Sequence, residues 1–175
     1  DLREEKIFTI DGDDAKDFDD AVGIKKLEHG WRLGIHIADV SHYVKENTAL
    51  DKDAFERGTS IYLPGRVIPM LPEKLSNGLC SLRPDEDRLT LSVIMEIDTG
   101  GKVISHTLAK SIIRSKYRLT YDNVTKLLEG DKELCGIYSD IADDLQEMQR
   151  LAEILTNMRK NRGAVSFNFP ESRIK

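Results

Sequence analysis

A run of aspartates between two apolar segments is the feature that most constrains this chain. Residues 9–21 hold six carboxylates and one lysine; they follow Lys6–Ile10, which is typical of a β-strand, and lead into the apolar segment Ala21–Ile24. Because like charges repel each other and disfavour ionisation, a fold with this run beside its core must balance the carboxylates with cations or leave them in water. A plain solvated loop needs neither flanking strands nor an aromatic residue, Phe18, within it. We therefore interpret the run as a candidate cation site.

Carboxylate oxygens are ligands that favour hard cations such as Mg²⁺ or Mn²⁺. In an extended segment Asp17 and Asp19 point to the same side, whereas Asp20 points to the other side unless a turn intervenes. An EF-hand calcium loop starting at Asp11 would need a ligand, a glycine and an acid at the positions occupied by Ala15, Lys16 and Val22. The spacing therefore excludes that type of site.

A phosphatase interpretation stays open. Residues 8–13 resemble the strand-end Asp-x-Asp of haloacid-dehalogenase-like phosphohydrolases, in which Asp11 would be the nucleophile and Asp13 the general acid and base. Ala15 stands where Thr or Val is usual, no clear downstream Gly-Asp pair follows, and the later aspartates have no role in that scheme.

Length and composition indicate one globular domain. The chain has 175 residues, of which 39% are hydrophobic and 33% charged, and its apolar runs are too short to span a membrane. The charged start, residues 1–5, is unlike a signal peptide. Cys80 and Cys135 are far apart in sequence, which excludes a disulfide framework or a zinc knuckle, and we expect a reduced, cytoplasmic protein.

The net charge of −5 argues against nucleic acid as a partner, but the charge is uneven. Residues 1–109 contain 14 Lys and Arg and 21 Asp and Glu, a net of −7, whereas residues 110–175 contain 12 and 10, a net of +2. Much of the acidic excess lies in the aspartate run itself, so bound cations would neutralise the part of the chain that most repels phosphates.

Hydrophobic periodicity predicts one continuous α/β unit without repeats or linkers. Besides Lys6–Ile10, we expect strands at Trp31–Val40, Leu91–Ile97 and Lys102–Ile113, with a hairpin turn at Thr99–Gly101 and the start of another strand at Val165–Phe169. We expect helices at Ala49–Arg57, Asp122–Glu129 and Ser139–Arg162.

The pattern from Asp11-Gly12 to Asp17-Phe18-Asp19-Asp20-Ala21 resembles the signature of the RNB catalytic domain of the RNase II and ribonuclease R exoribonucleases. Gly12 and Phe18 favour the ribonuclease R branch. Further blocks match the family in the same order along the chain, namely His36–Val44, Gly58–Gly65, Ile68–Pro72 and Leu75–Leu82.

The resemblance implies curved mixed sheets flanked by helices, in a catalytic domain about twice as long as this chain. Residues 1–175 would be its N-terminal part, without the cold-shock-like domains before it, the S1 domain after it, or the second half, which supplies a catalytic arginine and base-clamping residues. The implied activity is Mg²⁺-dependent 3′→5′ hydrolysis of single-stranded RNA to nucleoside 5′-monophosphates. We expect a monomeric parent protein with no membrane partner and no small-molecule cofactor. A non-catalytic fragment that binds metal or RNA is a further alternative.

The resemblance also implies roles for individual residues. The catalytic and metal-binding carboxylates would be Asp11, Asp17, Asp19 and Asp20, hereafter the aspartate cluster. We assign Asp11 and Asp20 to one Mg²⁺ or Mn²⁺, and Asp17 and Asp19 to a second ion or to the attacking water. Tyr62 would lie beside the terminal nucleotide and Tyr121 near the RNA path, although a lone tyrosine is more often half-buried with its hydroxyl bonded. Asp13 and Asp14 match no required acid and should face solvent.

Other polar residues receive structural interpretations. The spacing of His36, Asp39 and His42 suits hydrogen bonding better than a zinc site, and the two cysteines are read as small buried hydrophobes. Four cations either contact phosphates or form a solvated strand face, and the sequence leaves both possibilities open for Lys110, Arg114, Lys116 and Arg118.

Overall fold

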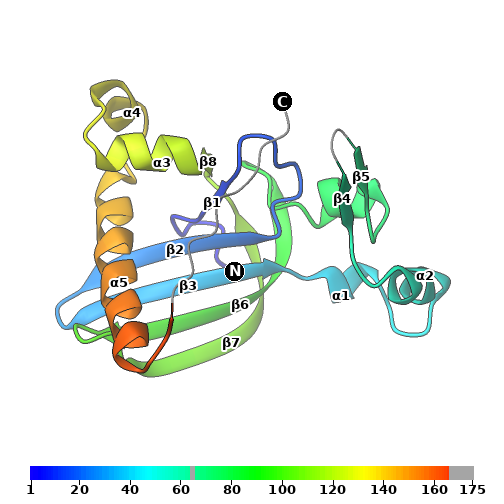
Figure 1. The fold of residues 1–175 in the computed structure, drawn as a ribbon, viewed down its shortest axis with the longest axis horizontal. Helices are drawn as coiled ribbons and strands as arrows, with labels where there is room; N and C mark the ends of the chain where they lie inside the picture. The colour runs from blue at the N-terminus through cyan, green and yellow to red at the C-terminus, as the bar shows by residue number, and fades with distance from the viewer. Residues whose placement is uncertain (64–65, 166–175) are drawn as a thin grey trace.

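Six strands form one curved mixed sheet in the computed structural model, which describes residues 1–63 and 66–165 (Figure 1). The strands are β1 (Phe8–Asp11), β2 (Asp20–Leu27), β3 (Gly30–Ala38), β6 (Asp87–Asp98), β7 (Val103–Arg114) and β8 (Tyr117–Thr120). Their order is β7-β6-β3-β2-β1-β8, and every neighbouring pair is antiparallel except β1 and β8, which are parallel. The predicted mixed α/β class is confirmed.

Alternation along the strands divides the core between the two faces of the sheet. Phe8 packs with Leu119, Leu127, Ile141 and Leu145 beneath the helices, whereas its neighbour Ile7 packs on the opposite face with Phe18, Ala21, Leu82 and Ile113. The helices are α3 (Tyr121–Leu128), α4 (Lys132–Ile137) and α5 (Ala142–Asn161). In the described residues no helix has both the length and the apolar character needed to cross a membrane.

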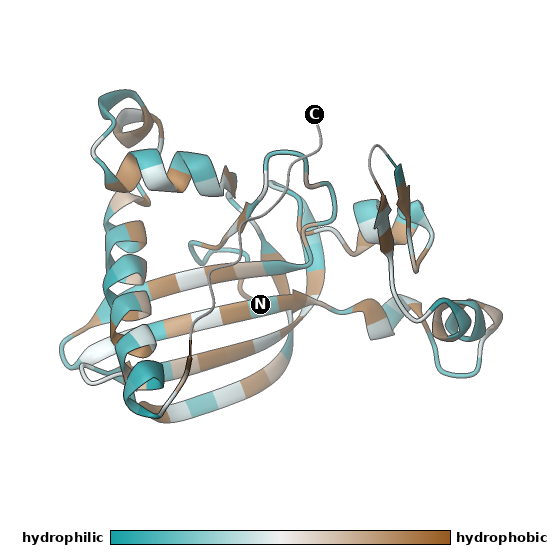
Figure 2. Cartoon of the chain, in the orientation of Figure 1, coloured by the Kyte–Doolittle hydropathy of each residue, from teal (hydrophilic) through white to brown (hydrophobic). Residues whose placement is uncertain are grey.

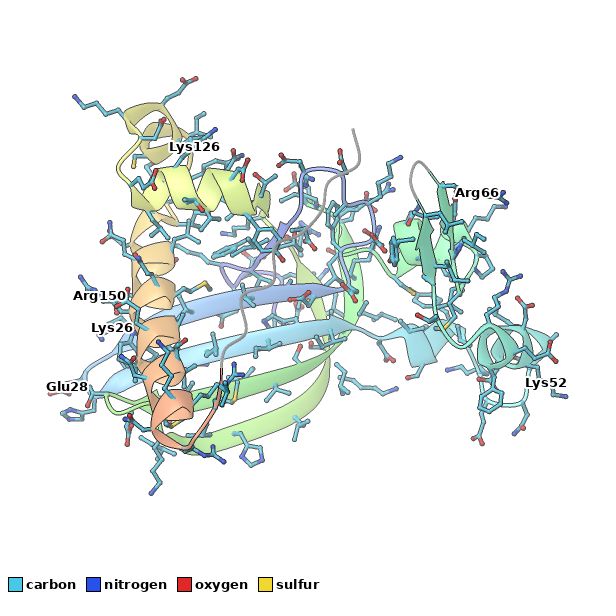
Figure 3. The ribbon with its side chains drawn as sticks, viewed as in Figure 1. Lys26, Glu28, Lys52, Arg66, Lys126 and Arg150 are labelled. Carbon is cyan, nitrogen blue, oxygen red and sulfur yellow. The ribbon has the colours of Figure 1, made fainter. Side chains whose placement is uncertain are left out.

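A polar contact fixes α5 to the sheet. The indole Nε1 of Trp31 donates to Oε2 of Glu147 at 2.7 Å, and the Lys26 ammonium lies 3.3 Å from the same carboxylate and 3.9 Å from the centre of the indole ring. Arg150 pairs with the other carboxylate oxygen, so Lys26 and Arg150 lie on the same side of the molecule, beside α5 (Figure 3). The indole hydrogen bond, together with these cations, holds the pKa of Glu147 below its usual range.

The segment between β3 and β6 forms a lobe that projects beyond one end of the sheet (Figure 1). Its elements are α1 (Val40–Tyr43), α2 (Ala49–Arg57), the hairpin β4 (Ile61–Leu63) and β5 (Arg66–Ile68), and a π-helical turn, η1 (Leu75–Leu79). The helix α2 has the predicted bounds, because the Thr48 hydroxyl caps its N-terminus and Gly58, with φ of 72°, ends it in the left-handed conformation.

The strand and helix predictions that fall on the described residues are confirmed in type, and all but α2 are shifted at their ends. The turn after β6 forms as expected, since the Asp98 carboxylate accepts from the backbone N–H of Gly100 and Lys102 and Gly101 has a φ of 87°. The helix predicted from Ser139 begins at Ala142 instead. Six short elements were not predicted, namely α1, β4, β5, η1, β8 and α4. Of the strand predicted at Val165–Phe169, residues 166–169 lie outside the described residues.

Apolar residues recur along β3, β6 and β7 (Figure 2). On the face that carries α5, the helix packs over Ile24, Trp31 and Ile97, but further along the strands this face is open to solvent. Ile37 and Leu91 pair across β3 and β6 and are each 46% exposed, and Leu108 on β7 is 61% exposed. Among the described residues, the sheet therefore presents an uncovered apolar area.

Candidate active site

The aspartate cluster lies where β1 ends and β2 begins, at one end of the sheet. Residues 12–19, hereafter the carboxylate loop, connect Asp11 to Asp20 without regular structure. The end of β8 lies beside Asp11, which pairs with Thr120, and the end of β3 lies beside the loop, where the Ala38 N–H donates to the carbonyl oxygen of Asp19 at 3.0 Å. The termini of four strands thus position the ends of the loop.

Segment 80–82 anchors the second half of the carboxylate loop. Phe18 is buried; its N–H donates to Ser81 Oγ at 3.1 Å and its carbonyl oxygen accepts from the N–H of Leu82 at 2.7 Å. The same Ser81 hydroxyl donates to the carbonyl oxygen of Lys16 at 2.9 Å. Because Phe18 points into the core between Asp17 and Asp19, those two carboxylates are directed away from it, as expected for an extended segment.

Charge effects show that the four carboxylates are neighbours. Burial raises the pKa of Asp11, and the charges of Asp20, Asp19 and Asp17 raise it further, whereas the Arg118 guanidinium opposes the shift. Burial and the charge of Asp19 also raise the pKa of Asp20. Asp20 therefore lies with the others, because the irregular backbone of the loop removes the alternation that would have sent it to the opposite side.

Tyr62 reaches the cluster from the lobe. Its hydroxyl donates to Oδ2 of Asp17 at 3.3 Å, and the negative charge of Asp17 is the main cause that raises the pKa of the phenol. Tyr121 follows Thr120 at the same end of the sheet, as the first residue of α3. The two rings are 68% and 63% exposed respectively, so half-buried packing does not describe either tyrosine.

The donor set of the cluster fits a hard cation. It consists of carboxylate oxygens, and Oδ2 of Asp11 is buried and has no hydrogen-bond partner in the described structure, which is costly for a carboxylate unless a cation approaches it. Within residues 1–63 and 66–165, no three His, Cys, Asp or Glu side chains are already gathered closely enough to hold a metal ion. The carboxylates are thus neighbours but not a formed coordination shell.

The remaining sequence interpretations resolve in favour of structural roles. Asp13 and Asp14 are exposed, as predicted. His36 is buried and its Nδ1 lies 2.7 Å from Ser92 Oγ, while Asp39 accepts from the Ser41 hydroxyl at 2.6 Å. Cys80 is buried, and Cys135 is half-buried against the core under α3 and α5.

Three of the four candidate phosphate-binding cations have partners within the protein. Lys110 pairs with Asp39 at 3.4 Å and Arg114 with Asp87 at 2.7 Å. Arg118 donates from Nη2 to the carbonyl oxygens of Gly12 and Asp13. Sequence reasoning missed this role of Arg118 and that of Ser81, because a side chain that binds a backbone carbonyl leaves no pattern along the chain.

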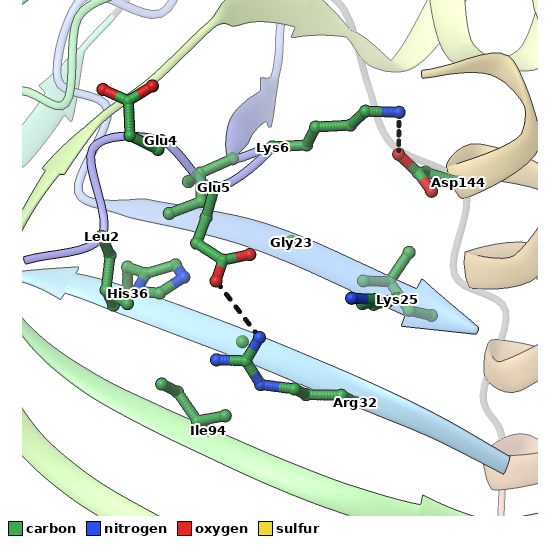
Figure 4. Close-up of a pocket in the computed structure, with 13 residues that line it drawn as sticks. Leu2, Glu4, Glu5, Lys6, Gly23, Lys25, Arg32, His36, Ile94 and Asp144 are labelled. Carbon is green, nitrogen blue, oxygen red and sulfur yellow. Dashed lines mark hydrogen bonds and ion pairs between the residues drawn. The ribbon is translucent and has the colours of Figure 1, made fainter. Parts of the chain in front are cut away.

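A separate cavity of about 290 Å³ lies between residues 2–7 and strands β2 and β3 (Figure 4). The paired Gly23 and Gly34 form part of its wall, and ion pairs join Arg32 to Glu5 at 3.2 Å and Lys6 to Asp144 at 3.5 Å. None of the predicted site residues lines it. The candidate active site is therefore the open end of the sheet rather than this cavity.

Comparison with known proteins gives concordant matches. The family described as "RNB domain" matches residues 1–175. Ribonuclease R 1 of Lactococcus lactis is 54% identical over 175 residues, which are 99% of this chain and 21% of that protein. The chain thus spans about a fifth of the length of this curated relative.

Solved structures share the fold. The RNase R of Mycoplasma genitalium in complex with ribose methylated single-stranded RNA matches with a TM-score of 0.88 and 34% identity over 97% of this chain and 26% of that chain. Yeast Ssd1, described as a pseudonuclease, matches with a TM-score of 0.77 and 23% identity over 92% of this chain and 19% of that chain. The second match shows the fold alone.

Proposed function

The chain belongs to the RNB domain family, and we propose from this that it carries the metal-binding part of a 3′→5′ exoribonuclease active site. The substrate is single-stranded RNA, and the products are nucleoside 5′-monophosphates. A 5′-monophosphate is released when water attacks the last phosphodiester and the bond from phosphorus to O3′ of the preceding nucleotide breaks. The new 3′ hydroxyl is then the end of the shortened RNA.

The convergence of the aspartate cluster with Tyr62 carries this proposal. Two carboxylates of the loop and the two at its ends act on one another, and the hydroxyl of an exposed tyrosine lies 3.3 Å from one of them, Asp17. Base stacking on an aromatic ring depends little on sequence, which suits an enzyme that degrades RNA of any sequence. Tyr121, exposed at the same end of the sheet, would contact the RNA further from the reacting phosphate.

Asp11 and Asp20 would hold one Mg²⁺, and Asp17 and Asp19 would hold a second ion or orient the attacking water. Bound Mg²⁺ would acidify water and stabilise charge on the attacking and leaving oxygens. The protein supplies the carboxylates on a loop fixed at both ends, and Oδ2 of Asp11 is the oxygen that most needs a cation. Mn²⁺ has the same preference for oxygen ligands and should substitute.

Residues 1–175 form, in this proposal, the N-terminal part of a larger catalytic domain. The uncovered apolar area around Ile37, Leu91 and Leu108 supports this, because large apolar patches on a protein surface mark contacts with other protein segments. The small share of the relative's length that the chain spans agrees. A cytoplasmic location remains an expectation from the reduced cysteines and from the bacterial relative.

Release of nucleotides from a 5′-labelled single-stranded RNA tests the proposal. We expect a ladder that shortens from the 3′ end with Mg²⁺, that is lost with EDTA, and that is lost in Asp19→Asn. Asp13→Asn, which changes an exposed carboxylate of the same loop, is the matched control and should cut normally. If the chain alone is inactive, the same variants are made in the full-length parent protein.

The alternatives predict other results. A phosphohydrolase that uses Asp11 and Asp13 would lose activity in Asp13→Asn and keep it in Asp19→Asn. A non-catalytic fragment would bind Mg²⁺ or RNA, and its full-length parent would release no nucleotide. Either result would overturn the exoribonuclease proposal.

A further inference from the structure

Arg118 lies one strand away from the aspartate cluster and reaches the carboxylate loop from there. It is on β8, beside Thr9 of β1, in the parallel pair that also places Thr120 beside Asp11. From this position its Nη2 donates to the carbonyl oxygens of Gly12, at 2.9 Å, and Asp13, at 2.6 Å. The two carbonyls are the first of the loop, immediately after the strand ends.

The same guanidinium contacts the other half of the loop. Its central carbon lies 5.5 Å from the centre of the Phe18 ring, a distance at which a cation is attracted to an aromatic face. Phe18 is in turn fixed by Ser81 and Leu82. Arg118 therefore joins the start of the loop to its buried aromatic residue, and segment 80–82 fixes the loop from the other side.

These contacts suit a positioning role better than a phosphate contact. Nε of Arg118 is buried and has no hydrogen-bond partner in the described structure, and Nη2 is used by two backbone carbonyls. Nη2 is thus bound to the backbone of the carboxylate loop, and Nε is shielded from a ligand. A lysine would keep the charge but lose the flat guanidinium that lies against the Phe18 ring while Nη2 donates to both carbonyls.

We propose that Arg118 is a positioning residue that holds the backbone of the carboxylate loop in place before a metal ion binds. The inference rests on the proposed function insofar as the loop is taken to be a metal site. Residues that orient metal ligands without touching the metal typically change metal affinity by 10–100-fold when replaced. Because the contacts are to backbone carbonyls, the order of the loop should depend on Arg118 even in metal-free protein.

The test uses Arg118→Lys and Arg118→Met, with Arg114→Met as the matched control, because Arg114 is a nearby arginine that pairs with Asp87. The first readout is hydrogen–deuterium exchange of the amides of residues 12–19 in EDTA. We expect faster exchange in Arg118→Met, an intermediate rate in Arg118→Lys and the original rate in the control. The second readout is calorimetric titration with Mn²⁺ alone, where we expect a tenfold or greater loss of affinity in Arg118→Met.

Each outcome decides a separate question. If loop exchange in Arg118→Met equals that of the unchanged protein, the positioning role is wrong, whatever the metal affinity. If the unchanged protein takes up no Mn²⁺, the metal site proposed above fails in this chain, while the exchange data in EDTA still judge Arg118. If Arg118→Met also loses protection in β3 and β6, the variant has unfolded. The exchange of residues 12–19 in Arg118→Lys then tests the positioning role.

Binding of a short single-stranded RNA in EDTA distinguishes a positioning role of Arg118 from a phosphate-binding role. A phosphate-binding arginine would weaken this binding when replaced and lower its salt dependence. A positioning arginine should leave it within about twofold of the original, and a larger loss would overturn the proposal.

Discussion

The hydroxyl of Tyr62 lies 3.3 Å from Oδ2 of Asp17, although the two residues are 45 positions apart and belong to the lobe and the carboxylate loop respectively. The contact joins the hairpin β4–β5 to the carboxylate loop, and Tyr62 is 68% exposed. The ring is therefore available to a ligand, and its hydroxyl is bonded to a carboxylate of the aspartate cluster.

Removing the Tyr62 ring should weaken RNA binding more than removing its hydroxyl. Stacking of one base on an aromatic ring contributes roughly 1–3 kcal/mol, so Tyr62→Ala should lower the affinity for a short single-stranded RNA about tenfold, whereas Tyr62→Phe should stay within about twofold. Fluorescence anisotropy in EDTA at one fixed salt concentration measures both. Phe55→Ala, which removes an 88% exposed ring of α2 in the same lobe, should have no effect. Equal losses in the Phe and Ala variants would assign the binding to the hydroxyl instead.

Neutralising Asp20 should stabilise the metal-free protein. Burial and neighbouring charges raise the pKa of Asp11 and Asp20 in the folded state, so folding favours their protonated forms and their ionisation costs stability. The cost is absent below the ordinary carboxyl pKa, grows as the pH rises towards the shifted pKa values, and is fully present above them, at pH 7. We expect Asp20→Asn to raise the Tm in EDTA at pH 7, by less than a buried carboxylate would, because Asp20 is exposed and water screens its charge.

The same variant should lose the stabilisation that Mg²⁺ confers, because ligand binding to the folded state raises the Tm only while the site exists. Thermal unfolding with Mg²⁺ and with EDTA, at pH 7 and pH 3, separates the two effects. Asp13→Asn should leave all of these transitions in place. A drop in the EDTA Tm at pH 7 in Asp20→Asn would show that the carboxylate stabilises the loop rather than straining it.

Local sequence patterns were sufficient to predict the elements whose ends or turns have characteristic residues. The helix α2 was predicted to the residue from the glycine that ends it, and the β6–β7 hairpin because its turn residues are diagnostic; the structure adds a capping threonine at the start of α2. The strand β8 was missed, because four residues have no readable period. It forms because Tyr117–Thr120 pair with β1 more than 100 positions earlier.

The members of the candidate site were predicted from a family pattern, but their arrangement was not. Reasoning on alternation alone directed Asp20 away from Asp17 and Asp19, and the irregular loop brings it back. Arg118 remained undecided between phosphate and solvent, although its partners are the carbonyls of Gly12 and Asp13. Such tertiary contacts to the backbone are independent of the partner's side chain, so sequence motifs do not record them.

Acid should destabilise this protein partly through His36. Burial lowers the pKa of this imidazole to about 4; the Arg32 charge lowers it as well, and Glu5 opposes the shift. The unfolded chain takes up the proton near pH 6.5 and the folded protein only near pH 4, so this contribution is complete above pH 6.5 and is lost as the pH falls towards 4. The shift corresponds to about 3 kcal/mol.

His36→Asn should therefore flatten the pH dependence of the unfolding free energy between pH 6.5 and 4, whatever change in the unfolding free energy it causes at pH 8. Urea unfolding at several pH values measures this slope. His106→Asn, on the exposed face of β7, should keep the original slope. If the slope survives in His36→Asn, the acid sensitivity comes from other groups.

Ser81 should stabilise the carboxylate loop, although its side chain is small. Its hydroxyl accepts from the N–H of Phe18 and donates to the carbonyl oxygen of Lys16, and its side chain is fully buried. Ser81→Ala would leave a buried N–H without a partner, which costs about 1–3 kcal/mol and should lower the Tm by at least about 2 °C. Because both bonds go to the loop, amide exchange should increase at residues 16–19 more than in the sheet. Ser105→Ala, at an exposed position of β7, should change neither quantity. Uniformly faster exchange across the sheet would mean that Ser81 supports the core as a whole and that Arg118 fixes the loop without it.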